Sequence, residues 1–204
     1  MIGSGTTLIE SKLLNRRSIG IDINPEAVKI TERKLKFEED YKYQPEIILG
    51  DVRYLTNIKS RSIDLIITHP PYFKIINYSQ GRIKNDLSTI NRLETFLKEI
   101  SKAATELFRV LKNDCYCAIL IGDTRKHSHY VPLSYYFLNI FLKTGFILKE
   151  EIIKLQHNCR RSSYWQNKIK NYNFYLIKHE HLFVFRKPKN NDDLDKYKYS
   201  SKID

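Results

Sequence analysis

Short apolar runs alternate with amphipathic stretches along most of the chain. Five runs have the length of buried strands: residues 18–23, 46–49, 63–68, 115–121 and 146–155. Helices are predicted in the segments between them: up to about residue 14, then 25–39, where charged residues recur at helical spacing, 89–112, where apolar residues do so, and 132–143. Strands that alternate with helices predict an α/β protein with a mostly parallel sheet. Alternating strand-like runs at 172–186 follow 146–155 without an intervening helix, which predicts an antiparallel end of the sheet.

This pattern continues without a repeat or a linker to residue 188, so we expect residues 1–188 to form one domain. The tail, 189–204, is rich in charge and is expected to be disordered. No apolar run approaches the roughly 20 residues that span a bilayer, and the N-terminus lacks a signal-peptide pattern. We therefore expect a cytoplasmic protein.

The net charge of +12 favours polyanionic partners. The positive charge is concentrated near the C-terminus, where residues 154–189 contain nine Lys and Arg but a single acidic residue. Aromatic residues that can stack on unpaired bases are interleaved there. The candidate nucleic-acid contacts in this segment are Arg160, Arg161, Tyr164 and Trp165. A solvated, lysine-rich surface would produce the same composition, so both interpretations stay open.

A glycine-rich turn and two aspartates at strand ends indicate a nucleotide-like ligand. Gly3-Ser4-Gly5-Thr6 precedes a helix, where a ligand can approach the backbone N–H groups. Asp22 ends the following strand, and an acid at this distance from the turn suits ribose hydroxyls. Asp51 ends the next strand. Ligands of open α/β sheets bind at such ends, although helix capping would explain each aspartate alone.

The segment Thr68-His69-Pro70-Pro71-Tyr72 closes the strand at 63–68. Two prolines cannot donate to a ladder, so the strand must stop there, and they hold the carbonyl groups rigidly. A rigid carbonyl, a polar side chain before it and an aromatic ring after it form a cradle for a planar ring that bears an amino group. A simple strand-terminating turn is the alternative.

The stretches GSGTTL, GIDINPEAV, LGDV and ITHPPY, in this order, resemble the S-adenosylmethionine-dependent DNA methyltransferases that modify exocyclic amino groups of cytosine (N4) or adenine (N6). The resemblance covers most of residues 2–188 and implies a Rossmann-like methyltransferase sheet with an antiparallel last strand. It also implies S-adenosylmethionine as cofactor and DNA as partner.

Residue by residue, the resemblance assigns two groups of functions. Gly3, Ser4, Gly5 and Thr6 would approach the amino-acid part of S-adenosylmethionine. Asp22 would bind the ribose hydroxyls and Ile23 the adenine ring, while Asp51 would accept from the adenine amino group with Val52 beside it. Thr68, His69, Pro70, Pro71 and Tyr72 would form the catalytic pocket for the target base.

The chain departs from the family pattern at two places. The family usually has Asp, Asn or Ser where this chain has His69, whose neutral imidazole offers one acceptor nitrogen. Met1 stands where the family's first central strand should end, so we expect an N-terminally incomplete sheet that lacks this strand. A gene fragment or a partner chain that supplies the strand explains this better than another segment of the chain.

Other functions remain open. Methyltransferases that act on RNA or on a protein glutamine also carry Pro-Pro-Tyr motifs, and an inactive nucleic-acid-binding remnant or subunit would fit both departures. Cys115 and Cys117 share one face of a strand and are interpreted as core residues. His179 and His181 also share a face, but the sequence shows no third ligand near them, so no metal is predicted.

Overall fold

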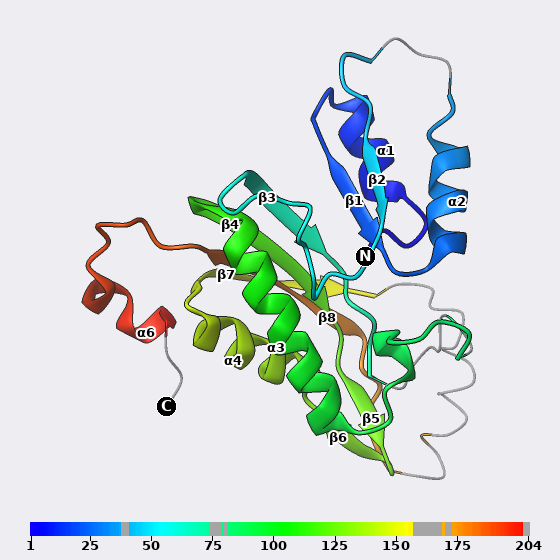
Figure 1. Ribbon diagram of the computed structural model, residues 1–204. Helices are drawn as coiled ribbons and strands as arrows, with labels where there is room; N and C mark the ends of the chain where they lie inside the picture. Colours follow the sequence, from blue (N-terminus) through cyan, green and yellow to red (C-terminus); the bar gives the residue numbers. More distant parts are fainter. Residues whose placement is uncertain (38–40, 74–78, 80, 157–168, 170–172, 202–204) are drawn as a thin grey trace.

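The computed structural model describes residues 1–37, 41–73, 79, 81–156, 169 and 173–201. Its N-terminal part is a two-stranded parallel sheet of β1 (Ile19–Asp22) and β2 (Glu46–Leu49), flanked by α1 (Thr6–Leu13) and α2 (Pro25–Lys34) (Figure 1). Asn24 caps α2 by accepting from the Glu26 amide, and Pro25 occupies the first turn as its fixed φ favours.

The larger sheet has four strands in the order β3-β4-β8-β7. They are β3 (Ile63–Thr68), β4 (Leu111–Ile121), β8 (His179–Arg186) and β7 (Ile147–Leu155). The pair β3–β4 is parallel, whereas β8 is antiparallel to both β4 and β7. The mixed sheet with an antiparallel strand and the α/β class are therefore confirmed.

One face of this sheet is covered by α3 (Leu93–Val110) and α4 (Leu133–Thr144) (Figure 1). Side chains that alternate along β4 point into this layer, so Cys117, Ile119 and Ile121 are buried. Phenylalanines from both helices and from β8 complete the core: Phe96, Phe137, Phe141, Phe183 and Phe185. The helical periodicity predicted for 89–112 is confirmed, although the helix starts at Leu93.

The edge of β3 that faces away from β4 is open among the described residues. No ladder joins β3 to β1, which belong to separate sheets. Leu65 and Ile67 on β3 are 55% and 58% exposed, an unusual exposure for the aliphatic residues of a strand beside a core. The described part of the chain thus leaves an unpaired apolar edge between the two sheets.

Several elements differ from the sequence prediction. A hairpin of β5 (Thr124–Lys126) and β6 (His129–Val131) was not predicted, because His127 and Ser128 make its turn at positive φ without a glycine. A short 3₁₀ helix, η1 (Leu87–Thr89), precedes α3, and α2 ends at Lys34 rather than at residue 39.

The tail at 189–204, which was expected to be disordered, is helical in part. It contains the 3₁₀ helix η2 (Leu194–Tyr197) and the short helix α6 (Lys198–Ser201). Arg186 anchors the tail to the sheet, since it pairs with Asp192 at 2.9 Å and lies over the ring of Tyr197. Among the described helices, none has the length and apolarity needed to cross a membrane.

Candidate functional site

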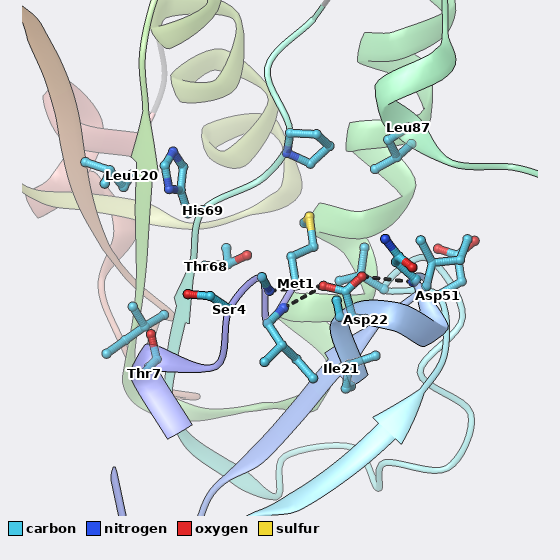
Figure 2. Close-up of a pocket in the computed structure, with 18 of the residues that line it drawn as sticks. Met1, Ser4, Thr7, Ile21, Asp22, Asp51, Thr68, His69, Leu87 and Leu120 are labelled. Carbon is cyan, nitrogen blue, oxygen red and sulfur yellow. Dashed lines mark hydrogen bonds between the residues drawn. The ribbon is translucent and has the colours of Figure 1, made fainter. Parts of the chain in front are cut away.

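A cavity of about 540 Å³ opens between the N-terminal sheet and the ends of β3 and β4, a size typical of a small-molecule site (Figure 2). The predicted cofactor residues that line it are Gly3, Ser4, Thr6, Asp22, Ile23, Asp51 and Val52. Thr68, His69 and Pro71 of the predicted catalytic motif line it as well. The two groups of predicted residues, separate in the sequence, therefore share one cavity.

The glycine-rich turn has the backbone that its sequence requires. Gly3 and Gly5 both adopt positive φ, +58° and +84°. A Cβ on Gly3 would meet nothing within 4 Å, so the absent side chain leaves room at the cavity wall. Gly5 is buried below the turn, where a Cβ would lie 2.7 Å from Thr31, and it is not among the described residues that line the cavity.

Asp22 links this turn to the end of β1. Its Oδ2 accepts from the amides of Ile2 (2.8 Å) and Gly3 (3.2 Å), and its Oδ1 accepts from the Asn24 amide (2.9 Å) (Figure 2). These three bonds fix the carboxylate at the cavity wall. A carboxylate has about four lone-pair sites, so capacity for a ligand hydroxyl remains.

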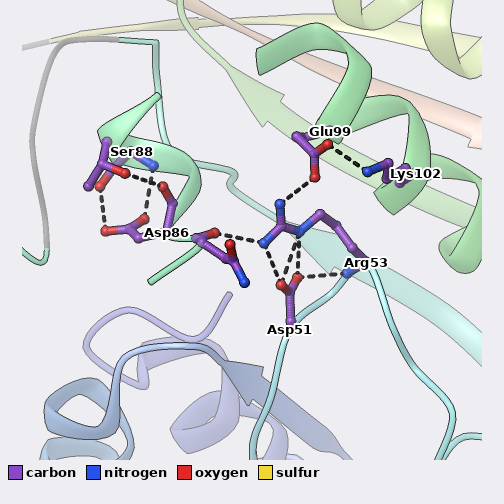
Figure 3. A network of polar contacts seen from close by, with 8 residues as sticks. Asp51, Arg53, Asp86, Ser88, Glu99 and Lys102 are labelled. Atoms are coloured by element: carbon purple, nitrogen blue, oxygen red, sulfur yellow. Dashed lines mark hydrogen bonds and ion pairs between the residues drawn. The ribbon is translucent and has the colours of Figure 1, made fainter. Parts of the chain in front are cut away.

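Asp51 is held by Arg53, a residue that the sequence analysis did not single out (Figure 3). The Arg53 Nε lies 3.0 Å from both oxygens of Asp51, and the Arg53 amide donates to Oδ1 at 2.9 Å. The same guanidinium pairs with Glu99 of α3 and donates to the Asn85 carbonyl at 2.7 Å. Because Arg53 uses both oxygens of Asp51, Asn85 and Asp86 at the same wall become further candidate acceptors.

The motif that was predicted to be catalytic follows β3 as expected, and the ladder ends at Thr68 paired with Ile119. The Thr68 hydroxyl is buried and, within the described part of the chain, has no hydrogen-bond partner. A polar ligand group in the cavity would satisfy it. Pro70 is buried and is not among the described residues that line the cavity. Tyr72 does not line the described cavity, and its ring lies so close to Gly122 that a Cβ there would be 3.0 Å away.

His69 and Tyr72 belong to a polar chain that continues into β8 and β7. The His69 Nε2 lies 2.7 Å from the Tyr72 hydroxyl, which donates to Glu180 of β8. Glu180 also accepts from Lys154 of β7 at 2.7 Å, and Lys154 lines the cavity. Glu180 and Lys154 carry no motif signal in the sequence, since only the pairing of β7 with β8 and of β8 with β4 brings them to the motif.

The pKa values of His69 and Glu180, two titratable groups of this hydrogen-bonded series, are both lowered. Burial lowers the pKa of His69 below its ordinary value and Lys154 adds to this, against the attraction of Glu180, so the imidazole is neutral near pH 7. Burial opposes ionisation of Glu180, but the hydrogen bonds from Lys154 and Tyr72 outweigh it and lower the pKa of this carboxyl. The motif thus joins a neutral imidazole to an ionised carboxylate.

Asp123 lies beside His179 and His181, with one possible ligand atom of each within 4.8 Å of the others. This is the third ligand that the sequence did not show. However, the Asp123 carboxylate already accepts from the Ser134 amide (2.8 Å), the Ser134 hydroxyl (3.0 Å) and the Tyr130 hydroxyl. These bonds hold the start of α4, and the absence of a metal stays a prediction. The predicted DNA contacts at 160, 161, 164 and 165 lie outside the described residues.

A family model for N6/N4 methyltransferases, described as DNA methylase, matches residues 2–33 and 63–203. The chain belongs to the N6/N4 DNA methylase family. No curated protein sequence matches this N6/N4 methylase chain. The family ranges include the glycine-rich turn, Asp22 and the motif at 68–72, and most of these residues line the cavity.

Solved structures give the same fold. TTHA0409 of Thermus thermophilus, named as a DNA modification methylase and solved with S-adenosylmethionine, superposes with a TM-score of 0.51 and 23% identity, over 71% of this chain and 56% of its own. A SAM-dependent methyltransferase from Methanosarcina mazei has a TM-score of 0.61 and 14% identity, over 92% of this chain and 89% of its own. A chain from the Haloferax volcanii complex of the Trm112 activator with a methyltransferase has a TM-score of 0.62 and 15% identity. The match covers 94% of this chain and 81% of that one.

These likenesses establish the fold of SAM-dependent methyltransferases for this N6/N4 methylase. The chain spans only about half of the Thermus protein's length, 53–56% in three structures of it.

Proposed function

We propose that this chain transfers a methyl group from S-adenosylmethionine to the exocyclic amino group of a DNA base, N4 of cytosine or N6 of adenine, in the cytoplasm. Membership of the N6/N4 DNA methylase family supports the reaction. The observation that carries the proposal is the shared cavity, because Asp22 and the glycine-rich turn border the same space as His69. A methyl donor and a target amino group would therefore meet there.

The cavity fits the cofactor in chemistry as well as in size. Gly3 and Ser4 would lie along its amino-acid part, Asp22 would accept from the ribose hydroxyls, and Ile23 and Val52 would contact the adenine ring. Asp51, with Asn85 and Asp86 nearby, would accept from the adenine amino group. When bound, S-adenosylmethionine supplies an electrophilic methyl group on a sulfonium centre.

The residues of the motif would prepare the amino nitrogen for attack. A neutral His69 accepts one amino hydrogen and the Pro70 carbonyl the other, which draws the nitrogen lone pair away from the ring. Tyr72, whose ring lies against Gly122 outside the cavity, would hold His69 through its hydroxyl. No strong base is required, because the methyl group leaves S-adenosylhomocysteine behind and makes the nitrogen cationic, and its proton would then pass to the His69 nitrogen that already accepts it. A protonated His69 would have no acceptor and would repel the cationic methyl donor.

DNA is the proposed substrate because the segment 154–189 is strongly basic. The target base would leave the duplex to reach His69, at a cost of a few kcal/mol that stacking and backbone contacts offset. Arg160, Arg161, Tyr164 and Trp165 are the proposed contacts to DNA.

We also propose that an upstream segment or a partner chain adds a strand between β1 and β3, where the first central strand of the family would lie. The exposed Leu65 and Ile67 support this. Hydrogen exchange tests it: the amides of β3 should exchange faster in this chain alone than in the protein purified from its native source. Equal exchange rates would count against an added strand.

Labelled methyl transfer tests the reaction. The chain is incubated with S-adenosylmethionine carrying a tritiated methyl group and with DNA, RNA or a protein pool, and the DNA is then digested to nucleosides for mass spectrometry. We expect label in DNA alone, as N4-methyldeoxycytidine or N6-methyldeoxyadenosine. Label in RNA or protein would contradict DNA as substrate, and a chain that binds no S-adenosylmethionine in calorimetry would be an inactive remnant.

A further inference from the structure

The hydrogen bonds around Tyr72 restrict the proton positions on His69. A tyrosine hydroxyl has one proton to donate. Tyr72 lies within hydrogen-bond distance of both the Glu180 carboxylate and the His69 Nε2. An ionised carboxylate can only accept, so the Tyr72 proton goes to Glu180. Toward His69, the Tyr72 oxygen can then act only as an acceptor.

Glu180 is well placed to hold this proton position. It is 5% exposed on β8, where an ionised carboxylate needs partners. Lys154 provides one of them at 2.7 Å, and Tyr72 provides the other. Charge-assisted hydrogen bonds of this kind are about twice as strong as neutral ones, so the Tyr72 proton is held firmly on the Glu180 side.

A neutral imidazole carries its single proton on Nδ1 or on Nε2. Among the residues that the structure describes, the groups that face His69 are the Tyr72 hydroxyl, Glu180 at 3.9 Å from Nε2, and Lys154 beyond it. Because the Tyr72 oxygen accepts, Nε2 must carry the proton to complete the 2.7 Å hydrogen bond. The lone pair of His69 then lies on Nδ1, on a side chain that lines the cavity and is 52% exposed.

We propose that Glu180 is a positioning residue of the methyl-transfer site: through Tyr72 it fixes the Nε2–H tautomer of His69, so that Nδ1 accepts a hydrogen of the target amino group. The part that concerns the amino group rests on the proposed function. Asp, Asn and Ser present an acceptor oxygen at this position directly, whereas a histidine needs a neighbour that decides which nitrogen accepts. Glu180 and its partner Lys154 fill this need.

Nuclear magnetic resonance tests the tautomer without any activity. Long-range proton–nitrogen spectra of the ¹⁵N-histidine-labelled chain distinguish Nε2–H from Nδ1–H, and the His69→Asn spectrum identifies the His69 signals by difference. We expect a single Nε2–H tautomer in the wild type and a mixture of both tautomers in Glu180→Gln and in Tyr72→Phe. An Nδ1–H signal in the wild type, or an unchanged pure tautomer in both variants, would overturn the proposal.

Kinetics test the link to the reaction. Glu180→Gln should lower kcat/KM for DNA about tenfold, the effect of about one hydrogen bond, and leave the affinity for S-adenosylmethionine unchanged. In the His69→Asn background, where the acceptor oxygen needs no tautomer, the same change should cost less than about twofold. An equal loss in both backgrounds would show that Glu180 acts otherwise.

Glu151→Gln is the matched control. Glu151 is a glutamate on neighbouring β7 that contacts His181 rather than the motif, and its side chain is 44% exposed. Glu151→Gln should leave kcat/KM and the His69 signals unchanged. A loss of kcat/KM equal to that of Glu180→Gln would count against a specific role of Glu180. If the wild type transfers no methyl group, the proposed function fails, while the spectra still decide the tautomer.

Discussion

Arg53→Ala should lower the free energy of unfolding by about 3 kcal/mol. The Arg53 side chain is 5% exposed and links Asp51, Glu99 and the Asn85 carbonyl, so it ties the wall of the cavity to α3 (Figure 3). Removal of one partner from a buried ion pair costs about 3–5 kcal/mol, because the other charge stays behind without a counter-ion.

The lower end of that range applies here. The carboxylates left behind are 19% exposed for Asp51 and 15% for Glu99, and Glu99 keeps Lys102 at 2.7 Å. Water and Lys102 therefore offset part of the loss. For a chain of this size, about 3 kcal/mol corresponds to a decrease in Tm of roughly 6–12 °C.

Urea unfolding followed by circular dichroism measures this change at pH 7, with differential scanning fluorimetry for Tm. Arg53→Lys should lower the free energy of unfolding by less than Arg53→Ala does, because an ammonium keeps the charge but cannot bind both carboxylates through a planar fork. The control is Lys29→Ala, which breaks the exposed pair with Glu26, 66% and 68% exposed, and should change stability by less than about 0.5 kcal/mol.

The pH dependence adds a second check. The hydrogen bond from Lys102, and then that from Arg53, lower the pKa of Glu99 below its ordinary value. This contribution to stability is thus present above the unfolded pKa and is lost as the pH falls through the lowered one. The difference in free energy of unfolding between the wild type and Arg53→Ala should therefore become smaller below about pH 4. The reasoning would be refuted if Arg53→Ala lowered the free energy of unfolding by less than about 1 kcal/mol at pH 7. It would also be refuted if the difference from the wild type grew as the pH fell.

Three further predictions concern the cavity. Asp22→Asn should weaken S-adenosylmethionine binding about tenfold or more in calorimetry, because the amide has one acceptor oxygen for the loop amides and the ribose; unchanged affinity would remove Asp22 from the site. Gly5→Ala should destabilise the fold by about 2 kcal/mol in urea unfolding, because φ is +84° and the new Cβ meets Thr31 at 2.7 Å; equal stability would contradict this strain. Since burial lowers the pKa of His69, the methyl-transfer rate should persist as the pH falls through the ordinary pKa of histidine and should drop only below the lowered one, and His69→Asn should abolish this drop; an acid limb that survives the substitution belongs to another group.

The sequence by itself determined the α/β class, the order along the chain of the strands in the two main sheets, and the positions of the candidate site motifs. Their signals are local: a helix needs its apolar period, and the glycine-rich turn needs the φ of Gly3 and Gly5. The two prolines end β3 wherever the strand lies in the sheet, because they lack backbone donors. Asp22 and His69 could be selected without coordinates, because each lies directly at a strand end.

Only the tertiary structure decided which side chains act on these residues. Arg53 reaches Glu99 across 46 positions of the chain, and Tyr72 reaches Glu180 across 108. No period or motif encodes such pairs, since they depend on the pairing of β4 with both β3 and β8 and on the packing of α3. Local chemistry therefore marks the residues that can bind a ligand, whereas the low-dielectric contacts that set their charge and proton positions exist only after distant strands have paired.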